Sequence, residues 1–316
     1  MSTCGPVLDA RRLAVLVLLM SMGACDPNSA DAPPEASRVP KVLLIGLDGV
    51  RPDVLAEVAT PNLDALIATG AFTDQARTGY PSVSGPGWSS MLNGAWPDKH
   101  GVTDNNFDND HFEEYPDFLT RIEQARPELR TYAVVDWVPL VRSDDQRHTI
   151  SDLIDTKVVL DGYELGWPEA DSLSVTMAVV EISTGNPDAL FVYLGNPDET
   201  SHHFESIGDE YRAAIEEADR AIGRLVAAVR ARASYQAEDW LILSSTDHGR
   251  TLDGDHGGDT AEERTIFFLA HGPSITPGSL TDSTFIVDIA VTALTHLGID
   301  VDPTWGLDGR AVGIRR

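Results

Sequence analysis

Cysteine is nearly absent from this chain, which has 2 cysteines in 316 residues. Cys4 and Cys25 both lie near the amino terminus, so the remainder of the chain has no thiol. This excludes a disulfide, a thiolate zinc site and a cysteine nucleophile from the main part of the protein. If that part binds a metal ion, we expect Asp, Glu or His side chains as its ligands.

Positive charge is also scarce. The chain has 23 Lys and Arg residues against 50 Asp and Glu residues, which gives a formal net charge of −27 at pH 7. An acidic surface repels nucleic acids and anionic lipids, so we expect no nucleic-acid binding. It repels phosphate-bearing substrates as well, and an anionic substrate would therefore need cations in its site. The alternative is that the acidity only keeps an exported protein soluble.

A single hydrophobic run near the amino terminus, Leu13–Met22, follows Arg11-Arg12. It is too short to span a bilayer core of ~30 Å and is typical of a signal peptide. The small residues Gly23 and Ala24 then precede Cys25, which resembles a bacterial lipoprotein processing site. We predict a lipoprotein signal peptide over residues 1–24 and lipidation of Cys25. Ordinary cleavage and an uncleaved anchor are the alternatives.

This processing would place the protein in the bacterial cell envelope, in the periplasm or on the outer surface, attached to the membrane through the lipid on Cys25. Residues 25–40 are rich in Pro, Ala, Ser and acidic side chains and predict a flexible tether. From residue 41 to residue 316, strand patterns alternate with helix patterns, which predicts one α/β domain.

Continuous apolar runs predict strands that are buried on both faces of a sheet. These runs are Val42–Leu47, Thr131–Val135, Ala189–Leu194, Trp240–Ser244 and Thr265–Ala270. Helical periodicity predicts helices at Tyr115–Gln124, Leu173–Ile182, Asp209–Ala233 and Ile286–Leu297. A further helix opens at Pro61, because proline suits the first turn of a helix.

Carboxylates and imidazoles gather where the predicted strands end, which is where open α/β sheets build their sites. The residues are Asp48, Asp198, His202, Asp247, His248 and His256. A set of this size suits two divalent metal ions. Mixed nitrogen and oxygen ligands favour Zn²⁺, whereas Mg²⁺ and Ca²⁺ prefer oxygen ligands alone. Manganese and iron are the alternatives to zinc.

A serine, Ser84, precedes a short predicted helix that ends near Asn93-Gly94, since Pro86 suits its first turn and glycine its end. The N–H groups of Gly87 and Trp88, together with the helix dipole, would favour an anion there. The alternative is that Ser84 serves only as a helix cap.

Taken in order, Asp48, Ser84, Asp198-x-x-x-His202, Asp247-His248 and His256 resemble the alkaline phosphatase superfamily, most nearly its type I phosphodiesterase/nucleotide pyrophosphatase branch. The segment Gly94–Asn105 and the tail from Asp288 to Arg310 resemble that branch as well. The resemblance implies a three-layer sandwich with a mostly parallel central sheet and helices on both faces.

The resemblance also implies the roles of these residues. It assigns one metal ion to Asp198, His202 and His256, and the other to Asp48, Asp247, His248 and the Ser84 oxygen. It implies that Ser84 attacks phosphorus and forms a phosphoseryl intermediate that is then hydrolysed. The expected protein is a metal-dependent hydrolase of small phosphate esters, either a phosphatase or a phosphodiesterase.

Some residues depart from the pattern. The resemblance places a phosphoryl-binding Asn at Gly87, so we expect a backbone N–H or Asn105, in the polar loop Gly101–Glu114, to supply that contact. Trp88 is expected either to line a leaving-group pocket or to pack the helix. Sulfatases of this superfamily mature a Cys or Ser within the pattern Cys/Ser-x-Pro-x-Arg. Ser84–Trp88 has the Pro but lacks the Arg, which argues against a formylglycine sulfatase.

Three alternative functions remain open from the sequence. The first is a nucleotide pyrophosphatase, and the second is a phosphonate or sulfate ester hydrolase of the same superfamily. The third is a metal-binding surface lipoprotein that keeps the fold without turnover, although the joint presence of Ser84 and all the metal ligands argues against it.

Overall fold

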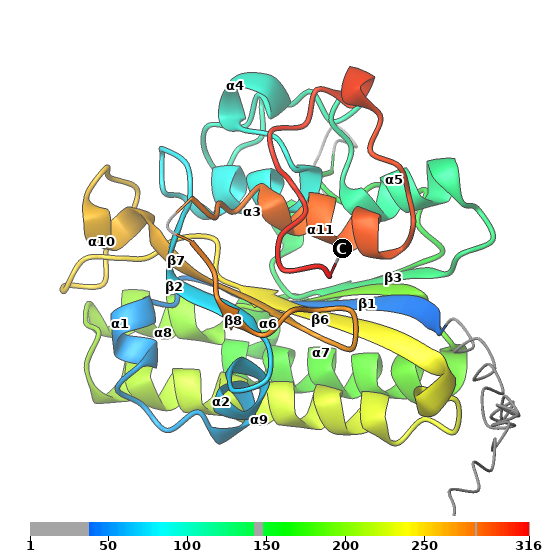
Figure 1. Ribbon diagram of the computed structural model, residues 1–316. Coiled ribbons are helices and arrows are strands. Elements are labelled where there is room, and N and C mark those ends of the chain that lie inside the picture. Colours follow the sequence, from blue (N-terminus) through cyan, green and yellow to red (C-terminus); the bar gives the residue numbers. More distant parts are fainter. Residues whose placement is uncertain (1–37, 142–147, 282, 316) are drawn as a thin grey trace, which may run out of the picture. The chain divides into compact units, whose positions relative to one another are not determined.

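The computed structural model describes residues 38–141, 148–281 and 283–315 (Figure 1). The predicted signal peptide, Cys25 and the tether up to residue 37 lie outside the described residues, so the lipid anchor stays a prediction. Within the described residues, no helix is both long enough and apolar enough to cross a membrane.

One sheet forms the centre of the described part of the chain. Its strands are β1 (Val39–Leu47), β2 (Ala71–Arg77), β3 (Thr131–Val135), β4 (Thr156–Val159), β5 (Ala189–Leu194), β6 (Glu238–Ser245), β7 (Thr265–His271) and β8 (Gly278–Ser279). The spatial order is β4-β3-β5-β1-β6-β7-β2-β8. Only the pairs of β7 with β6 and with β2 are antiparallel among the described strands. The predicted α/β fold with a mostly parallel sheet is confirmed.

Helices cover both faces of this sheet (Figure 1). They are α1 (Pro52–Leu55), α2 (Pro61–Ile67), α3 (Ser84–Asn93), α4 (Pro97–His100), α5 (Phe118–Ala125), α6 (Gly162–Leu165), α7 (Trp167–Val180), α8 (Asn196–Phe204), α9 (Asp209–Arg230), α10 (Ala261–Arg264) and α11 (Asp288–His296). In the view of Figure 1, α3, α4, α5 and α11 lie above the sheet, and α1, α2, α7, α8 and α9 lie below it.

Strand β1 explains why the central strands read as continuous apolar runs. Val42 and Leu44 belong to the core on the side of α3, α5 and α11. Leu43 and Ile45, which point to the opposite face, belong to the core on the side of α2, α7 and α9. Because successive side chains of a strand alternate between faces, a strand covered on both sides needs an apolar residue at every position.

The predicted elements are present with shifted ends. Strand β1 begins at Val39, inside the predicted tether, because Val39 and Pro40 pair with Glu238 and Asp239 of β6. Helix α5 begins at Phe118 because the Asp117 carboxylate accepts hydrogen bonds from the first free N–H groups of the helix. Strands β2, β4 and β8 were not predicted.

A buried carboxylate joins α9 to α2, which generates a prediction about stability. Asp219 is 2 % exposed and accepts hydrogen bonds from the N–H of Leu63, at 2.8 Å, and from the side chain of Asn62, also at 2.8 Å. We expect Asp219→Ala to lower the free energy of unfolding by about 2 kcal/mol, because it leaves the N–H groups of α2 without an acceptor. Urea denaturation would measure this.

Glu216→Ala is the matched control for Asp219→Ala, since it removes a carboxylate from the same helix at a position that is not buried. We expect a change of less than about 0.5 kcal/mol for this variant. Equal unfolding midpoints for the two variants would contradict the role of Asp219.

Candidate active site

The candidate site lies at the carboxyl ends of β1, β5 and β6. These three strands are neighbours, and their register aligns Leu47 of β1 with Leu194 of β5, and Gly46 of β1 with Ser245 of β6. The strands therefore end at one edge of the sheet, and the side chains that follow them meet there. Asp48 follows β1, Asp247 and His248 follow β6, and Asp198 lies in the first turn of α8, just after β5.

The first cluster consists of Asp48, Asp247 and His248, all buried. His248 Nε2 lies 3.5 Å from Asp48 Oδ1 and 3.4 Å from Asp247 Oδ2. Among the described residues, neither of these two carboxylate oxygens has a hydrogen-bond donor as a partner. Buried acceptors without donors are costly, and a cation between them would remove that cost. The cluster therefore fits a divalent metal ion.

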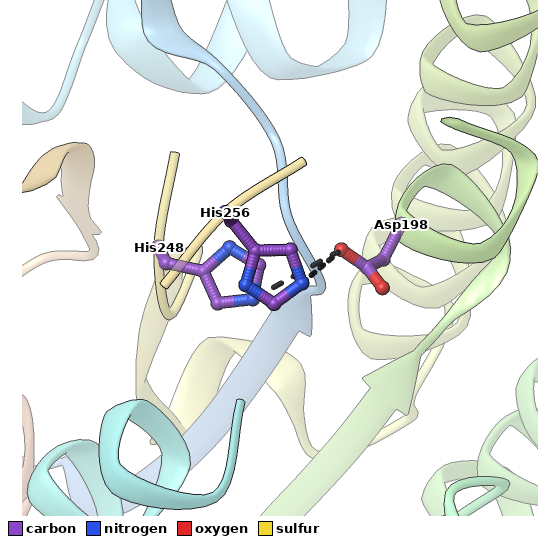
Figure 2. Close-up of side chains that lie close together, drawn as sticks. All are labelled: Asp198, His248 and His256. Atoms are coloured by element: carbon purple, nitrogen blue, oxygen red, sulfur yellow. Dashed lines mark ion pairs between the residues drawn. The ribbon is translucent and has the colours of Figure 1, made fainter. Parts of the chain in front are cut away.

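The second cluster consists of Asp198, His202 and His256. His202 Nε2 lies 3.2 Å from Asp198 Oδ2 and 3.0 Å from His256 Nε2. Figure 2 shows His248 and His256 side by side, both facing the Asp198 carboxylate, with ring centroids 3.8 Å apart. Since His248 Nε2 is 3.9 Å from Asp198 Oδ1, His248 lies between the two clusters. All the predicted metal ligands are thus brought together.

Backbone carbonyls orient two of the imidazoles. His248 Nδ1 lies 2.8 Å from the carbonyl oxygen of Gly249, and His256 Nδ1 lies 2.9 Å from that of Ser82. A carbonyl oxygen only accepts, so each Nδ1 carries the proton and each Nε2 is left as a ligand atom. Burial lowers the pKa of both histidines, which favours the neutral form that binds metal.

Two aromatic side chains hold the Oδ2 atom of Asp48. It accepts hydrogen bonds from the hydroxyl of Tyr193 at 2.5 Å and from the indole N–H of Trp88 at 3.0 Å. This leaves Oδ1 facing His248. Trp88 is fully buried and packs against Tyr193, with ring centroids 5.0 Å apart. Of its two expected roles, Trp88 has the packing role, because it is not among the described residues that line the cavity over the site, and this corrects its assignment to substrate binding.

The carboxylates of the site repel one another. Burial, and then the charge of Asp198, raise the pKa of Asp48 to about 7. Burial and the charges of Asp48 and Asp198 raise the pKa of Asp247 well above its usual range. Without a cation, Asp48 and Asp247 would have to share a proton. A bound dication would instead stabilise both in their charged form.

Ser84 is the first residue of α3, whereas the sequence predicted that it would precede the helix. It is 6 % exposed, and its Oγ lies 3.2 Å from His248 Nε2. The next residue, Gly85, donates its N–H to Asn105 Oδ1 at 2.7 Å, which places the Asn105 side chain beside Ser84. The hydroxyl of Ser84 therefore faces the first cluster.

Gly87 does not have its expected role. Its N–H donates to the carbonyl oxygen of Val83 at 2.9 Å and is not free to bind a phosphoryl oxygen. A Cβ atom at this position would lie 2.9 Å from the carbonyl oxygen of Asp247. Glycine is required here because α3 approaches the Asp247 loop so closely.

A cavity of about 280 Å³ opens over the site. Its walls include predicted site residues as well as aromatic and acidic residues that the sequence did not identify. The lining residues are Asp48, Ser84, Asn105, Trp137, Tyr163, Tyr193, Asp198, Glu199, His202 and His256. Nothing in the sequence singled out Trp137 or Tyr163, whereas Tyr193 could have been suspected because it lies near the end of the strand that leads to Asp198.

The family described as type I phosphodiesterase / nucleotide pyrophosphatase matches residues 42–138 and 133–252. The chain belongs to this family. The match ends before His256, so the assignment of His256 depends on the geometry of the site. The membership confirms the predicted branch of the alkaline phosphatase superfamily.

Curated relatives of this family member include bovine bis(5'-adenosyl)-triphosphatase ENPP4, which is 27% identical over 252 residues, 75% of this chain and 52% of the relative. Human ectonucleotide pyrophosphatase/phosphodiesterase family member 7 is 23% identical over 242 residues, 70% of this chain and 50% of that protein. The chain thus spans about half the length of these two relatives.

Solved structures share the fold. Murine ENPP5 in complex with AMP has a TM-score of 0.63 at 15% identity and covers 84% of this chain and 96% of its own. The 2-O GAG sulfatase BT1596 has a TM-score of 0.65 at 14% identity, with 86% of this chain and 73% of its own covered. At these identities the likeness is one of fold alone.

The hydrogen bond from Tyr193 to Asp48 generates a prediction about metal affinity. We expect Tyr193→Phe to weaken zinc binding by about tenfold, because hydrogen bonds to a ligating carboxylate fix its orientation. Calorimetric titration of the metal-stripped protein would measure this. Tyr132→Phe, which removes the hydroxyl of another buried tyrosine in a different core, is the control. Equal zinc affinities for the two variants would contradict the role of Tyr193.

Proposed function

We propose that this family member is a metal-dependent hydrolase of small phosphate esters that acts through Ser84 and two divalent metal ions. The observation that carries the proposal is the position of Ser84 Oγ, 3.2 Å from His248 Nε2, beside buried carboxylate oxygens that have no donor among the described residues. A serine at such a place is aligned to attack a phosphorus atom drawn to the same cations.

The two clusters would hold the metal ions. Asp48, Asp247 and His248 with the Ser84 oxygen would hold one, and Asp198, His202 and His256 the other. When bound, such a pair would stabilise the negative charge on the attacking and leaving oxygens of an in-line displacement. The mixed ligand set favours zinc.

The reaction has two steps in this proposal. Ser84 Oγ forms a bond to phosphorus as the bond to the leaving alcohol breaks, which gives a phosphoseryl group and the free alcohol. Water then attacks the phosphoseryl group, and Ser84 is restored as phosphate or a phosphate monoester leaves. Asn105, held beside Ser84 by its bond to the Gly85 N–H, would bind a phosphoryl oxygen through its side-chain amide.

The names of relatives point to nucleotide substrates, since one is a bis(5'-adenosyl)-triphosphatase and the murine ENPP5 structure contains AMP. The aromatic side chains of Trp137 and Tyr163 line the cavity and offer flat surfaces for part of a substrate. A phosphodiesterase or nucleotide pyrophosphatase activity is therefore the first specific form of the proposal.

Variants of Ser84 and of a metal ligand should separate chemistry from metal binding. We expect Ser84→Ala to keep both metal ions but to lower kcat by about a thousandfold or more. His256→Ala should lose one ion together with activity, because it removes a ligand atom. Metal analysis after dialysis, combined with turnover assays, would measure both effects.

Ser89→Ala is the control for these variants, since Ser89 is also buried in α3 and its hydroxyl lies 3.4 Å from that of Thr149, which belongs to neither cluster. It should keep both the metal ions and the activity. Full activity in Ser84→Ala would refute the covalent mechanism, and an unchanged metal content in His256→Ala would refute the ligand assignment.

Substrate preference can be tested with chromogenic esters. We expect the zinc-loaded protein to hydrolyse bis-p-nitrophenyl phosphate faster than p-nitrophenyl phosphate, with both rates dependent on Ser84, because the family is one of diester hydrolases. A preference for the monoester would instead make the protein a phosphatase. Hydrolysis of p-nitrophenyl sulfate alone would contradict phosphate ester hydrolysis altogether.

A further inference from the structure

A fully buried arginine, Arg250, lies at the centre of the segments that carry the metal ligands. Its Nε donates to the carbonyl oxygen of Gly49 at 2.9 Å, and its Nη1 donates to that of Gly254 at 2.9 Å. Its Nη2 forms an ion pair with Asp198 Oδ1. The sequence analysis did not identify this residue.

These contacts reach the four segments that carry the Asp and His side chains of the two clusters. Gly49 directly follows Asp48, and Gly254 lies two positions before His256. Asp198 is itself a ligand, and the Arg250 backbone follows Asp247-His248-Gly249 in the chain. One guanidinium group, with its donors fixed in a plane, therefore links segments that are far apart in the sequence.

The surroundings of Arg250 hold it in place. Arg51 Nη1 donates to the carbonyl oxygen of Arg250 at 2.6 Å, and the guanidinium group lies 5.4 Å from the ring centroid of Tyr211. Gly49 has a φ of +62°, and a Cβ there would collide with the Arg250 guanidinium and the Asp198 carboxylate. The turn after β1 thus leaves room for this one side chain.

The ion pair also determines how Asp198 presents its oxygens. Arg250 binds Oδ1, which also lies 3.8 Å from His256 Nε2, and Oδ2 lies 3.2 Å from His202 Nε2. The rotation of the carboxylate is fixed in this way without help from a metal ion. In addition, the arginine offsets one of the three negative charges of Asp48, Asp198 and Asp247.

We propose that Arg250 is a positioning residue that preorganises the metal centre, and that it does so through the fork geometry of its guanidinium group and not through its charge alone. It holds Asp198 in the orientation that the ion of the second cluster needs, and it ties the loop before His256 to the turn after Asp48. The inference rests on the proposed function in one respect, since it assumes that the clusters bind metal.

The test uses two substitutions in the full chain. Arg250→Lys keeps the positive charge but loses the planar fork, and Arg250→Met removes the charge at a similar length. Calorimetric titration of the metal-stripped proteins with Zn²⁺ gives the affinities of the two ions. We expect Arg250→Lys to weaken one of the two ions by about tenfold or more, and Arg250→Met to weaken it further.

Arg232→Lys is the matched control. Arg232 is also nearly buried, and it pairs with Glu238 at 2.7 Å near the start of β6, at the end of the strand opposite Asp247. This substitution should leave the affinities of both zinc ions unchanged. If Arg250→Met does not fold, as judged by circular dichroism, the comparison of Arg250→Lys with Arg232→Lys still decides the question.

Zinc affinities equal to those of the wild-type protein in Arg250→Lys would overturn the proposal, because charge alone would then explain the residue. An equal loss of affinity in Arg232→Lys would overturn it as well. Neither result would affect the proposed function if the wild-type protein binds zinc and shows Ser84-dependent turnover. Absence of zinc binding by the wild-type protein would overturn both.

Discussion

The mutual repulsion of three buried carboxylates, those of Asp48, Asp198 and Asp247, is the constraint on which the rest of the structure depends. Each acid is supported by donors that its own loop does not supply. Tyr193 and Trp88 donate to Asp48, the N–H of Gly49 donates to Asp247 Oδ1 at 3.2 Å, and Arg250 pairs with Asp198. Such a concentration of negative charge is stable only when cations and oriented donors surround it.

The fold brings these acids together through the parallel arrangement of its central strands. Because β1, β5 and β6 run in the same direction and end within one residue of one another in register, the residues that follow them reach the same edge of the sheet. Helix α3, which lies on the same side of the sheet as α5 and α11, then approaches this edge and places Ser84 opposite His248. The glycine at position 87 permits that approach, so the position of the serine depends on a residue that does not contact a substrate.

The sequence predicted the parts of the molecule whose patterns are determined locally. Strands such as β1 and β5 are buried on both faces, and their apolar runs have no other simple explanation. Strand β2 was missed because its sequence, Ala71–Arg77, contains polar residues that face outward beside an antiparallel partner. The residues of the two clusters could be predicted from their order along the chain. The roles of Trp88, Gly87 and Arg250 could not, because they depend on which elements pack face to face, and no local pattern records this.

The short loop between His248 and His256 connects the two clusters of carboxylates and imidazoles. It is closed by backbone hydrogen bonds between Thr251 and Asp255, at 2.8 Å, and between Gly254 and Thr251, at 3.2 Å. Since His248 and His256 lie at its two ends, an opening of this segment would displace a residue of each cluster in one event, and the two clusters would lose their arrangement together.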